Sequence, residues 1–251
     1  MRPTIVCHMM SSIDGRLNGD RWSEPFDGKN RDILFAPYYT ISERLSPEAH
    51  MLGRNTVQIH FCPKTFDHTG LPRAVRPEPY LALSPAPRKL VILDPHGKIF
   101  YDTNTIMDSG IIAVLGENVS EAYLTHLREN DISYLFAGAD GHDLENAMEQ
   151  IGTLFNIERI VLEGGGIVNG QFLKHGLIDE FSLMIYPGID GLAGIHSIVE
   201  YTGNDDVWLK KQLEAQHVTR IGDVFLATVN AQNELAVYPR TGERVAHEMF
   251  E

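Results

Sequence analysis

The chain has 251 residues, of which 43% are hydrophobic and 22% are charged; this composition fits one large or two small globular domains and excludes a disordered or fibrous chain. Its 34 acidic residues outnumber the 21 basic ones, so that the formal net charge at pH 7 is −13. A field of this sign repels phosphate backbones and anionic lipid heads, and we therefore expect neither nucleic acid nor membrane as a partner, although a local pocket can still accept a small anion.

Apolar runs of strand length alternate with segments of helical period, which predicts an α/β fold with a mostly parallel central sheet. The strands expected in this sheet are residues 4–9, 49–52, 89–93, 111–115, 132–137, 159–162 and 181–186. The helices expected between them are residues 30–45, 55–61, 144–155 and 168–175, with a further helix after residue 120. Pro37 falls inside the first helix, where a proline can break the hydrogen-bond ladder.

Short polar side chains mark the beginning of two of these helices. Ser120 and Asp143 are expected to be N-caps, because an oxygen at that position can accept a hydrogen bond from a free N–H of the first turn. The side chains expected to face the core are Tyr123, Leu124 and Leu127 in the first helix and Ala147, Met148, Ile151, Leu154 and Phe155 in the second. Gly176 is expected to end the last helix.

Two regions depart from this alternation. Residues 62–88 contain six prolines and are expected to form an irregular excursion. Near the C-terminus, residues 213–219 and 224–229 have strand character and flank Gly222-Asp223, which predicts an antiparallel hairpin. Residues 235–238 are expected to add a strand before a loose tail. We therefore expect one domain over residues 1–230 and a C-terminal extension over residues 231–251.

Other classes of protein find little support. Two cysteines, Cys7 and Cys62, are too few for a disulfide framework, and no apolar run is long enough for the core of a signal peptide or for a membrane helix. We therefore expect a cytoplasmic protein. The eleven histidines show no H-x-x-x-H spacing, and no serine lies in a G-x-S-x-G elbow, so neither a metal site nor a hydrolase is predicted.

The most informative segment is residues 160–170, in which a buried strand runs into Gly164, Gly165 and Gly166 and then into a helix. Glycines at such a junction let main-chain N–H groups approach a ligand, and the helix start adds free donors and a partial positive charge. The spacing differs from G-x-G-x-x-G, so a Rossmann domain is not predicted. A plain flexible turn is the alternative, but three consecutive glycines favour a site for a pyrophosphate or another anion.

Two further strand ends carry polar side chains. Ser11, Ser12 and Asp14 follow the first strand, and Gly53 with Thr56 follows the second. Taken singly, these segments are ordinary turns or helix caps. Because the carboxyl ends of parallel strands share one edge of a sheet, where α/β proteins bind their ligands, the three segments together predict a binding site there. Glu163 ends its strand at the same edge.

The motifs resemble those of the riboflavin-pathway pyrimidine reductases, a family with the dihydrofolate-reductase-like fold. The resemblance is carried by residues 162–166 (Leu-Glu-Gly-Gly-Gly), 177–180 (Leu-Ile-Asp-Glu), 185–187 (Ile-Tyr-Pro) and 12–16 (Ser-Ile-Asp-Gly-Arg), by Gly53 with Thr56-Val57, and by Asp94. Their order and spacing agree over roughly residues 4–230.

The resemblance implies a reductase with NADPH as hydride donor, a small heterocyclic substrate of the ribosylamino-pyrimidine type, and a homodimer. It places the following residues at the cofactor: Met10, Trp22, Gly53, Thr56, Asp94, Gly164, Gly165, Gly166, Ile167, Val168 and Asn169. Glu163 would face the substrate and Asp14 would shape the pocket; either of them, or a bound water, could relay the proton that must follow the hydride.

The chain departs from the family pattern in two places. Residues 58–63 read Gln-Ile-His-Phe-Cys-Pro, where the family usually has an aspartate, a proline and an arginine, and Pro95-His96 follows Asp94 where the family often has a serine or lysine suited to the 2′-phosphate of NADPH. NADH thus stays open as the cofactor. Two other functions also stay open: reduction of a dihydrofolate-like pterin, and cofactor binding without catalysis.

Overall fold

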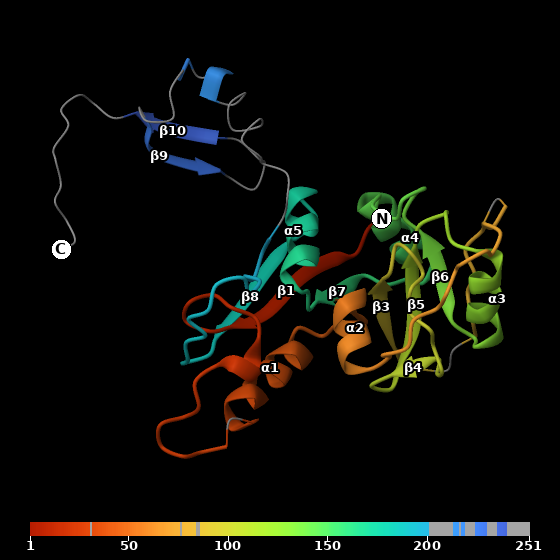
Figure 1. Ribbon diagram of the computed structural model, residues 1–251, viewed down its shortest axis with the longest axis horizontal. Coiled ribbons are helices and arrows are strands. Elements are labelled where there is room, and N and C mark those ends of the chain that lie inside the picture. Colours follow the sequence, from red (N-terminus) through yellow and green to blue (C-terminus); the bar gives the residue numbers. More distant parts are fainter. Residues whose placement is uncertain are drawn as a thin grey trace. The chain divides into compact units, whose positions relative to one another are not determined.

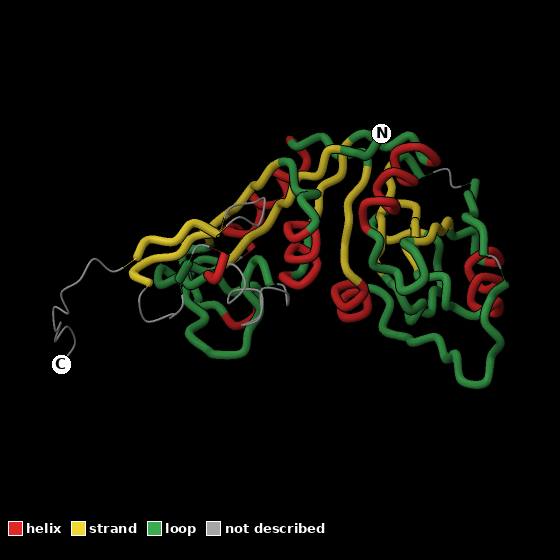
Figure 2. Tube along the Cα trace, turned by 90° about the horizontal axis from the view of Figure 1, so that it is seen from above, coloured by secondary structure: helices red, strands yellow, loops and turns green. Residues whose placement is uncertain are grey.

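The computed structural model describes residues 1–30, 32–75, 77–83, 86–200, 213–215, 217–218, 224–229 and 235–239. The chain divides into two compact units, Met1–Glu200 and Tyr201–Glu251. In the described part of the first unit an eight-stranded sheet is surrounded by helices (Figure 1 and Figure 2).

The strands of this sheet are β1 (Thr4–Ser11), β2 (Ala49–Gly53), β3 (Arg88–Leu93), β4 (Thr105–Ile106), β5 (Ser109–Leu115), β6 (Ser133–Phe136), β7 (Arg159–Leu162) and β8 (Glu180–Ile185). The helices are α1 (Asp32–Arg44), α2 (Arg54–His60), α3 (Glu121–Glu129), α4 (Leu144–Leu154) and α5 (Gly166–Lys174), with a short 3₁₀ helix at Gly19–Arg21. None of the helices in the described residues is long and apolar enough to cross a membrane.

The strands lie in the order β6–β5–β3–β2–β7–β1–β8, and all neighbours in this order are parallel. The short β4 is antiparallel to the beginning of β5. The prediction of a mostly parallel sheet is thus confirmed. β4 was not predicted, because two residues are too short a segment to show a hydrophobic period.

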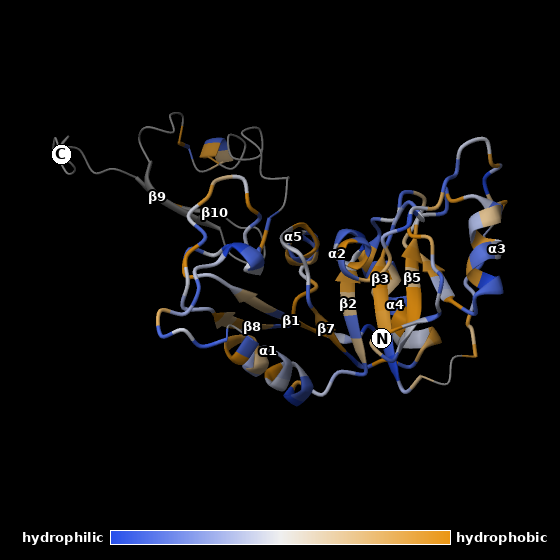
Figure 3. Ribbon diagram, turned by 60° about the horizontal axis from the view of Figure 1, so that its bottom comes forward, coloured by the Kyte–Doolittle hydropathy of each residue, from blue (hydrophilic) through white to orange (hydrophobic). Residues whose placement is uncertain are grey.

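Two apolar clusters hold the sheet between its helices. On one face, Cys7, Met51 and Leu162 pack with side chains of α4 and of α5, such as Met148 and Phe172. On the other face, the cluster joins β2, β3, β5 and β6 to α2, α3 and residues that follow them. Figure 3 shows β3 and β5 in the orange of hydrophobic residues, as expected for parallel strands that are covered on both faces.

Several local predictions are confirmed. The Ser120 hydroxyl accepts a hydrogen bond from Tyr123 N and the Asp143 carboxylate one from Asn146 N, so both residues are N-caps. Gly176 follows α5 with a φ of +63°, a conformation that favours glycine. Pro37 lies inside α1 without ending it.

Two expectations are wrong. Leu154, expected in the core, has 36% of its surface exposed, because it lies at the last turn of α4, beyond the buried stripe that ends with Ile151. Residues 213–215, expected to begin a strand, are helical; the Leu-Glu-Ala sequence favours a helix.

The second unit contains an antiparallel pair of strands, β9 (Val224–Val229) and β10 (Leu235–Pro239). An antiparallel pair near the C-terminus is therefore present, as expected, but its strands are not the predicted ones: residues 224–229 pair with the strand that follows them, and the two form a separate two-stranded sheet. The predicted turn at Gly222-Asp223 lies outside the described residues.

Candidate functional site

The strand ends of β2 and β7 meet the beginning of α5. Glu163 N donates to Met51 O at 3.0 Å, and Gly53 N donates to Gly164 O at 3.0 Å. A Cβ on Gly53 would lie 2.7 Å from Val168 Cγ2, closer than a side chain can be accommodated. Glycine at this position therefore lets α5 approach the end of β2.

Residues 164–166, which we call the glycine bend, lead from β7 into α5. Gly164 has a φ of +66°, and a Cβ on it would lie 2.8 Å from Asn169 Nδ2. Gly165 is the N-cap of α5, and a Cβ on it would meet no atom within 4 Å. The bend is thus closed by protein at Gly164 and open at Gly165.

The first turn of α5 offers hydrogen-bond donors on this open side. Among the described residues, no protein acceptor takes the N–H groups of Gly165, Ile167 and Val168. Free N–H groups at a helix start carry a partial positive charge, so the turn suits an anion such as a phosphate.

Residues 195–200 pack against the other side of the same turn. A Cβ on Gly166 would overlap the carbonyl oxygen of Ser197. Glu200 N donates to Gly166 O at 2.9 Å, and Asn169 Nδ2 donates to Ile198 O at 2.8 Å. Within the described residues Asn169 Oδ1 is buried and has no hydrogen-bond donor. The bend therefore leaves one unused acceptor beside its free donors.

Asp14 lies in the turn that follows β1 and ties it to the loop after β8. Its carboxylate accepts hydrogen bonds from Ser12 Oγ at 2.7 Å, Asp190 N at 3.1 Å and Gly191 N at 3.0 Å. The Ser12 hydroxyl first, and then the two main-chain donors, lower the pKa of Asp14 well below its usual range. At neutral pH Asp14 is therefore ionised and poorly suited to donate a proton.

Met10 and Trp22 lie on the β1–β8 side of the glycine bend. Met10 is partly buried in β1 beside Met184 of β8. Trp22 is 4% exposed and packs in an aromatic cluster with Phe35 of α1 and with Tyr186, whose ring centre is 4.8 Å from that of Trp22. The cluster fixes the loop before α1 against the end of β8.

Thr56 and Asp94 lie on the other side of the bend. Thr56 is partly buried in the first turn of α2. Asp94, directly after β3, is fully buried and accepts a hydrogen bond from Ile99 N at 2.9 Å. Burial raises the pKa of Asp94, although main-chain donors oppose this. The structure thus brings Gly53, the glycine bend and α5 into contact, whereas the Asp94 carboxylate is turned into the protein.

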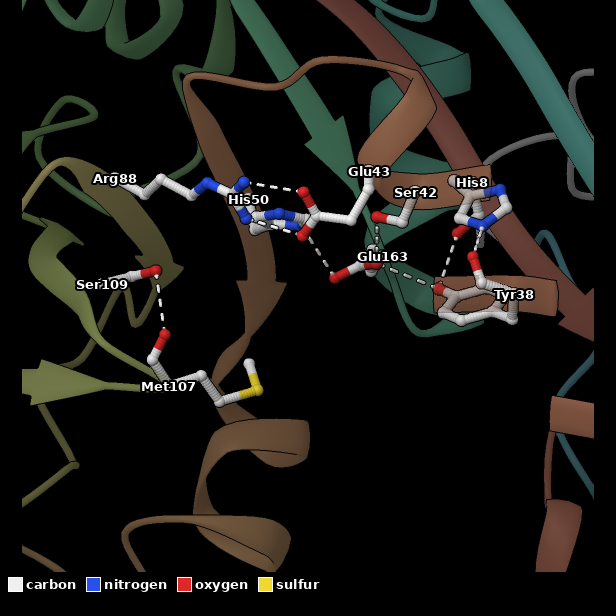
Figure 4. A network of polar contacts seen from close by, with 9 residues as sticks. All are labelled: His8, Tyr38, Ser42, Glu43, His50, Arg88, Met107, Ser109 and Glu163. Carbon is white, nitrogen blue, oxygen red and sulfur yellow. Dashed lines mark hydrogen bonds and ion pairs between the residues drawn. The ribbon is translucent and has the colours of Figure 1, made fainter. Parts of the chain in front are cut away.

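Glu163, directly before the bend, belongs to a partly buried polar network that the sequence analysis did not predict (Figure 4). Its carboxylate accepts hydrogen bonds from Tyr38 Oη at 3.3 Å, Ser42 Oγ at 3.3 Å and His50 Nδ1 at 3.2 Å. Burial, and after it the neighbouring Glu163 carboxylate, raises the pKa of Tyr38 well above its usual value. His8 and His50 are the sequence signal that could have indicated the network, because each is a polar residue inside an otherwise apolar strand.

The described residues contain no group of three or more histidine, cysteine or acidic side chains placed to hold a metal ion. Cys7 and Cys62 are both free thiols and buried.

The sequence profile described as the RibD C-terminal domain matches residues 3–227 of the chain. A 2,5-diamino-6-ribosylamino-4(3H)-pyrimidinone 5′-phosphate reductase of Methanothermobacter thermautotrophicus is 24% identical over 229 residues, which cover 89% of this chain and 95% of the relative. A reductase of the same name from Kluyveromyces marxianus is 26% identical over 240 residues, 88% of each chain. The crystal structure of a pyrimidine reductase-like protein from Corynebacterium diphtheriae superposes with a TM-score of 0.52 at 17% identity, over 95% of this chain and 93% of that one, which supports the fold.

Proposed function

The chain belongs to the RibD C-terminal domain family, and from this premise we propose that it is a nicotinamide-dependent reductase of riboflavin biosynthesis that reduces a ribosylamino-pyrimidinone 5′-phosphate. The observation that carries the proposal is the glycine bend, with an open face at Gly165 and free donors in the first turn of α5. The names of the two relatives that align over most of the chain support the substrate class.

The residues at the bend fit a dinucleotide. The N–H groups of Gly165, Ile167 and Val168 would bind the diphosphate, and the bare α-carbon of Gly165 leaves room for its approach. Asn169 is fully buried behind the bend and supports it through the hydrogen bond from its Nδ2 to Ile198 O. When bound, the nicotinamide supplies a hydride to the substrate, and the role of the chain is to hold the ring against the reacting carbon.

Asp14 shapes the pocket in this proposal and does not supply the proton. Its lowered pKa keeps it ionised at neutral pH, and its three hydrogen bonds hold the turn after β1 to the loop after β8. The proton that follows the hydride then comes from a bound water, which needs no side chain with a raised pKa.

We propose NADPH as the cofactor, following the family, with Arg54 as the cation that would meet its 2′-phosphate. Arg54 is the first residue of α2 and follows Gly53 directly. Its guanidinium donates to Gln58 Oε1, one turn further along α2, and remains partly exposed. A preference for NADH would show that Arg54 does not contact the 2′-phosphate.

A homodimer is also part of the proposal. β8 is an edge strand in the described residues, because β1 is its one partner there. Phe181, Leu183 and Ile185 alternate along it and are 47%, 42% and 60% exposed. An apolar edge of this kind is a natural surface for a second copy of the chain.

The test is to titrate the protein with NADPH and NADH, following the nucleotide fluorescence, and then to add the pyrimidinone 5′-phosphate named for the relatives. We expect saturable binding and, with the substrate present, oxidation of the nucleotide at 340 nm on the order of 1–10 turnovers per second or fewer. A protein that binds neither nucleotide would refute the proposal.

A second candidate is the reduction of a heterocycle that carries no phosphate. The observation that favours it is segment 58–63: Gln58 is engaged by Arg54 and by Thr65 Oγ1, at 3.1 Å from the latter, and no arginine or lysine occurs in the segment. Turnover of a dihydropterin, with none of the phosphorylated pyrimidinone, would select this candidate.

A further inference from the structure

We propose that Glu163 is a positioning residue, held by Tyr38 and His50, that fixes the glycine bend for the cofactor, and that it does not relay a proton; this inference rests on the function proposed above. Glu163 directly precedes Gly164, yet its side chain leaves the sheet on the face opposite to α5. Along β7, Ile160 and Leu162 pack with the α4 and α5 cluster, so that Glu163, one residue further, faces α1.

The carboxylate of Glu163 is occupied by hydrogen bonds from protein side chains. Three donors reach it, the Tyr38 and Ser42 hydroxyls from α1 at 3.3 Å each and His50 Nδ1 from β2 at 3.2 Å. The side chain of Glu163 is 14% exposed and that of His50 is 16% exposed, so little of the pair reaches solvent. A carboxylate that exchanged protons with a substrate would have to give up some of these bonds in each turnover.

Tyr38 is itself held in place by contacts with His8 of β1. Its ring stacks on that of His8 with centres 4.2 Å apart and planes 15° apart, and its hydroxyl also lies 3.1 Å from His8 O, so that its single proton is shared between this carbonyl and Glu163. His8 Nε2 lies 3.1 Å from Tyr38 O; because a carbonyl oxygen only accepts, this nitrogen carries the proton. The network therefore continues from Ser182 of β8, whose hydroxyl is 3.0 Å from His8 Nδ1, through β1 and α1 to Glu163.

The glycine bend is thus attached to β2 and α1 at its first end, and its last residue, Gly166, is bonded to Glu200 N. Its main chain is bonded to β2 through Glu163 N and Gly164 O, and its last side chain before the glycines is bonded to α1. Residues 164–166 carry no side chain that could restrain the main chain, so the orientation of the free N–H groups depends in part on the attachment that precedes Gly164. Weakening the attachment to α1 should therefore act on cofactor affinity more than on the rate once cofactor is bound.

The first test compares Tyr38→Phe with Tyr39→Phe, a matched control one residue away whose side chain is 65% exposed. Loss of the Tyr38 hydroxyl should raise the Kd for NADPH by about three- to tenfold, the net effect of one ordinary hydrogen bond, with a smaller change in kcat at saturating NADPH. Ser42→Ala, which removes the second α1 donor, is the substitute should Tyr38→Phe fail to fold. Equal affinities of Tyr38→Phe and Tyr39→Phe would overturn the inference.

The second test is the pH dependence of kcat in Glu163→Gln. The amide keeps an acceptor for the α1 hydroxyls and loses the charge, so a positioning residue predicts a weaker NADPH complex and a pH profile of the wild-type shape. A general acid or base predicts instead the loss of one limb of that profile and a fall in kcat of about 10²-fold or more, and this outcome would overturn the inference. If the wild-type protein binds neither nucleotide, the proposed function itself is refuted. This outcome is distinct from a failure of the inference about Glu163, in which the wild-type protein does bind the nucleotide.

Discussion

At the scale of single residues, the chain uses its acidic side chains near the strand ends for structure. Asp14 closes a turn, Asp94 is buried against main-chain donors, and Glu163 is bonded to α1. The sequence indicated that acids would gather at this edge, because it shows where strands end. It could not show which way each carboxylate turns, because Tyr38, Ser42 and His50 reach Glu163 from positions more than 100 residues away.

Asp14→Asn is expected to lower the free energy of unfolding at pH 7 and to lower it by a smaller amount at pH 3. The pKa of Asp14 is lower in the folded chain than the ordinary value of about 3.9, so its contribution is complete well above that pH and declines as the pH falls from there toward the lower pKa of the folded chain. Urea unfolding of wild type and variant at both pH values measures this. A difference that does not shrink on acidification would contradict the role given to the charge.

Gly165→Ala is expected to weaken NADPH binding by about tenfold while the melting temperature stays close to that of the wild type. The added methyl group meets no protein atom within 4 Å, but it occupies the open side of the glycine bend, where the diphosphate would lie. Gly53→Ala is the contrasting variant, because its Cβ would lie 2.7 Å from Val168 Cγ2 and should lower stability and binding together. Fluorescence titration and thermal unfolding separate these effects, and unchanged binding in Gly165→Ala would argue against the site.

At the scale of helices and strands, most of the first unit follows from the sequence. Long apolar runs predicted seven of the eight strands of the sheet in the described residues, since strands buried on both faces need such runs. The order β2–β7–β1 could not be predicted, because which strands become neighbours depends on how the helices cross the sheet and not on any local pattern. α5 begins at Gly166, two residues before the predicted start, because glycine is tolerated in a first turn whose N–H groups have no helical partner.

Ser120→Ala is expected to lower the free energy of unfolding more than Asp143→Ala, although both remove an N-cap. An N-cap contributes about 1 kcal/mol. Ser120 is buried and its hydroxyl also donates to His68 Nδ1, 3.0 Å away, since His68 Nε2 is committed to Gly97 O. We therefore expect a loss of about 2 kcal/mol for Ser120→Ala against about 1 for Asp143→Ala, measured by chemical unfolding. The reverse order would show that the His68 bond does not stabilise the fold.

At the scale of the whole molecule, the exposed apolar face of β8 bears on whether two copies of the chain form a dimer. Leu183→Glu places a charge among Phe181 and Ile185 and is expected to convert a dimer to a monomer in sedimentation or light-scattering measurements. Leu83→Glu, at a side chain that is 98% exposed outside the sheet, is the control and should leave the mass unchanged. A wild-type protein that is monomeric at micromolar concentration would end this expectation.

The position of β1 in the sheet has a consequence for how the chain acquires its structure during synthesis. β1 is made first, yet its two neighbours, β7 and β8, are the last strands of the first unit to be made, with register pairs that join Thr4 to Arg159 and Ser11 to Ile185. In a nascent chain released before residue 185, β1 lacks one or both of its neighbouring strands. Unpaired apolar strand edges of this kind favour aggregation. Translation of nearly the whole unit must therefore precede its cooperative folding, and pairing over so long a stretch of sequence is intrinsically slow.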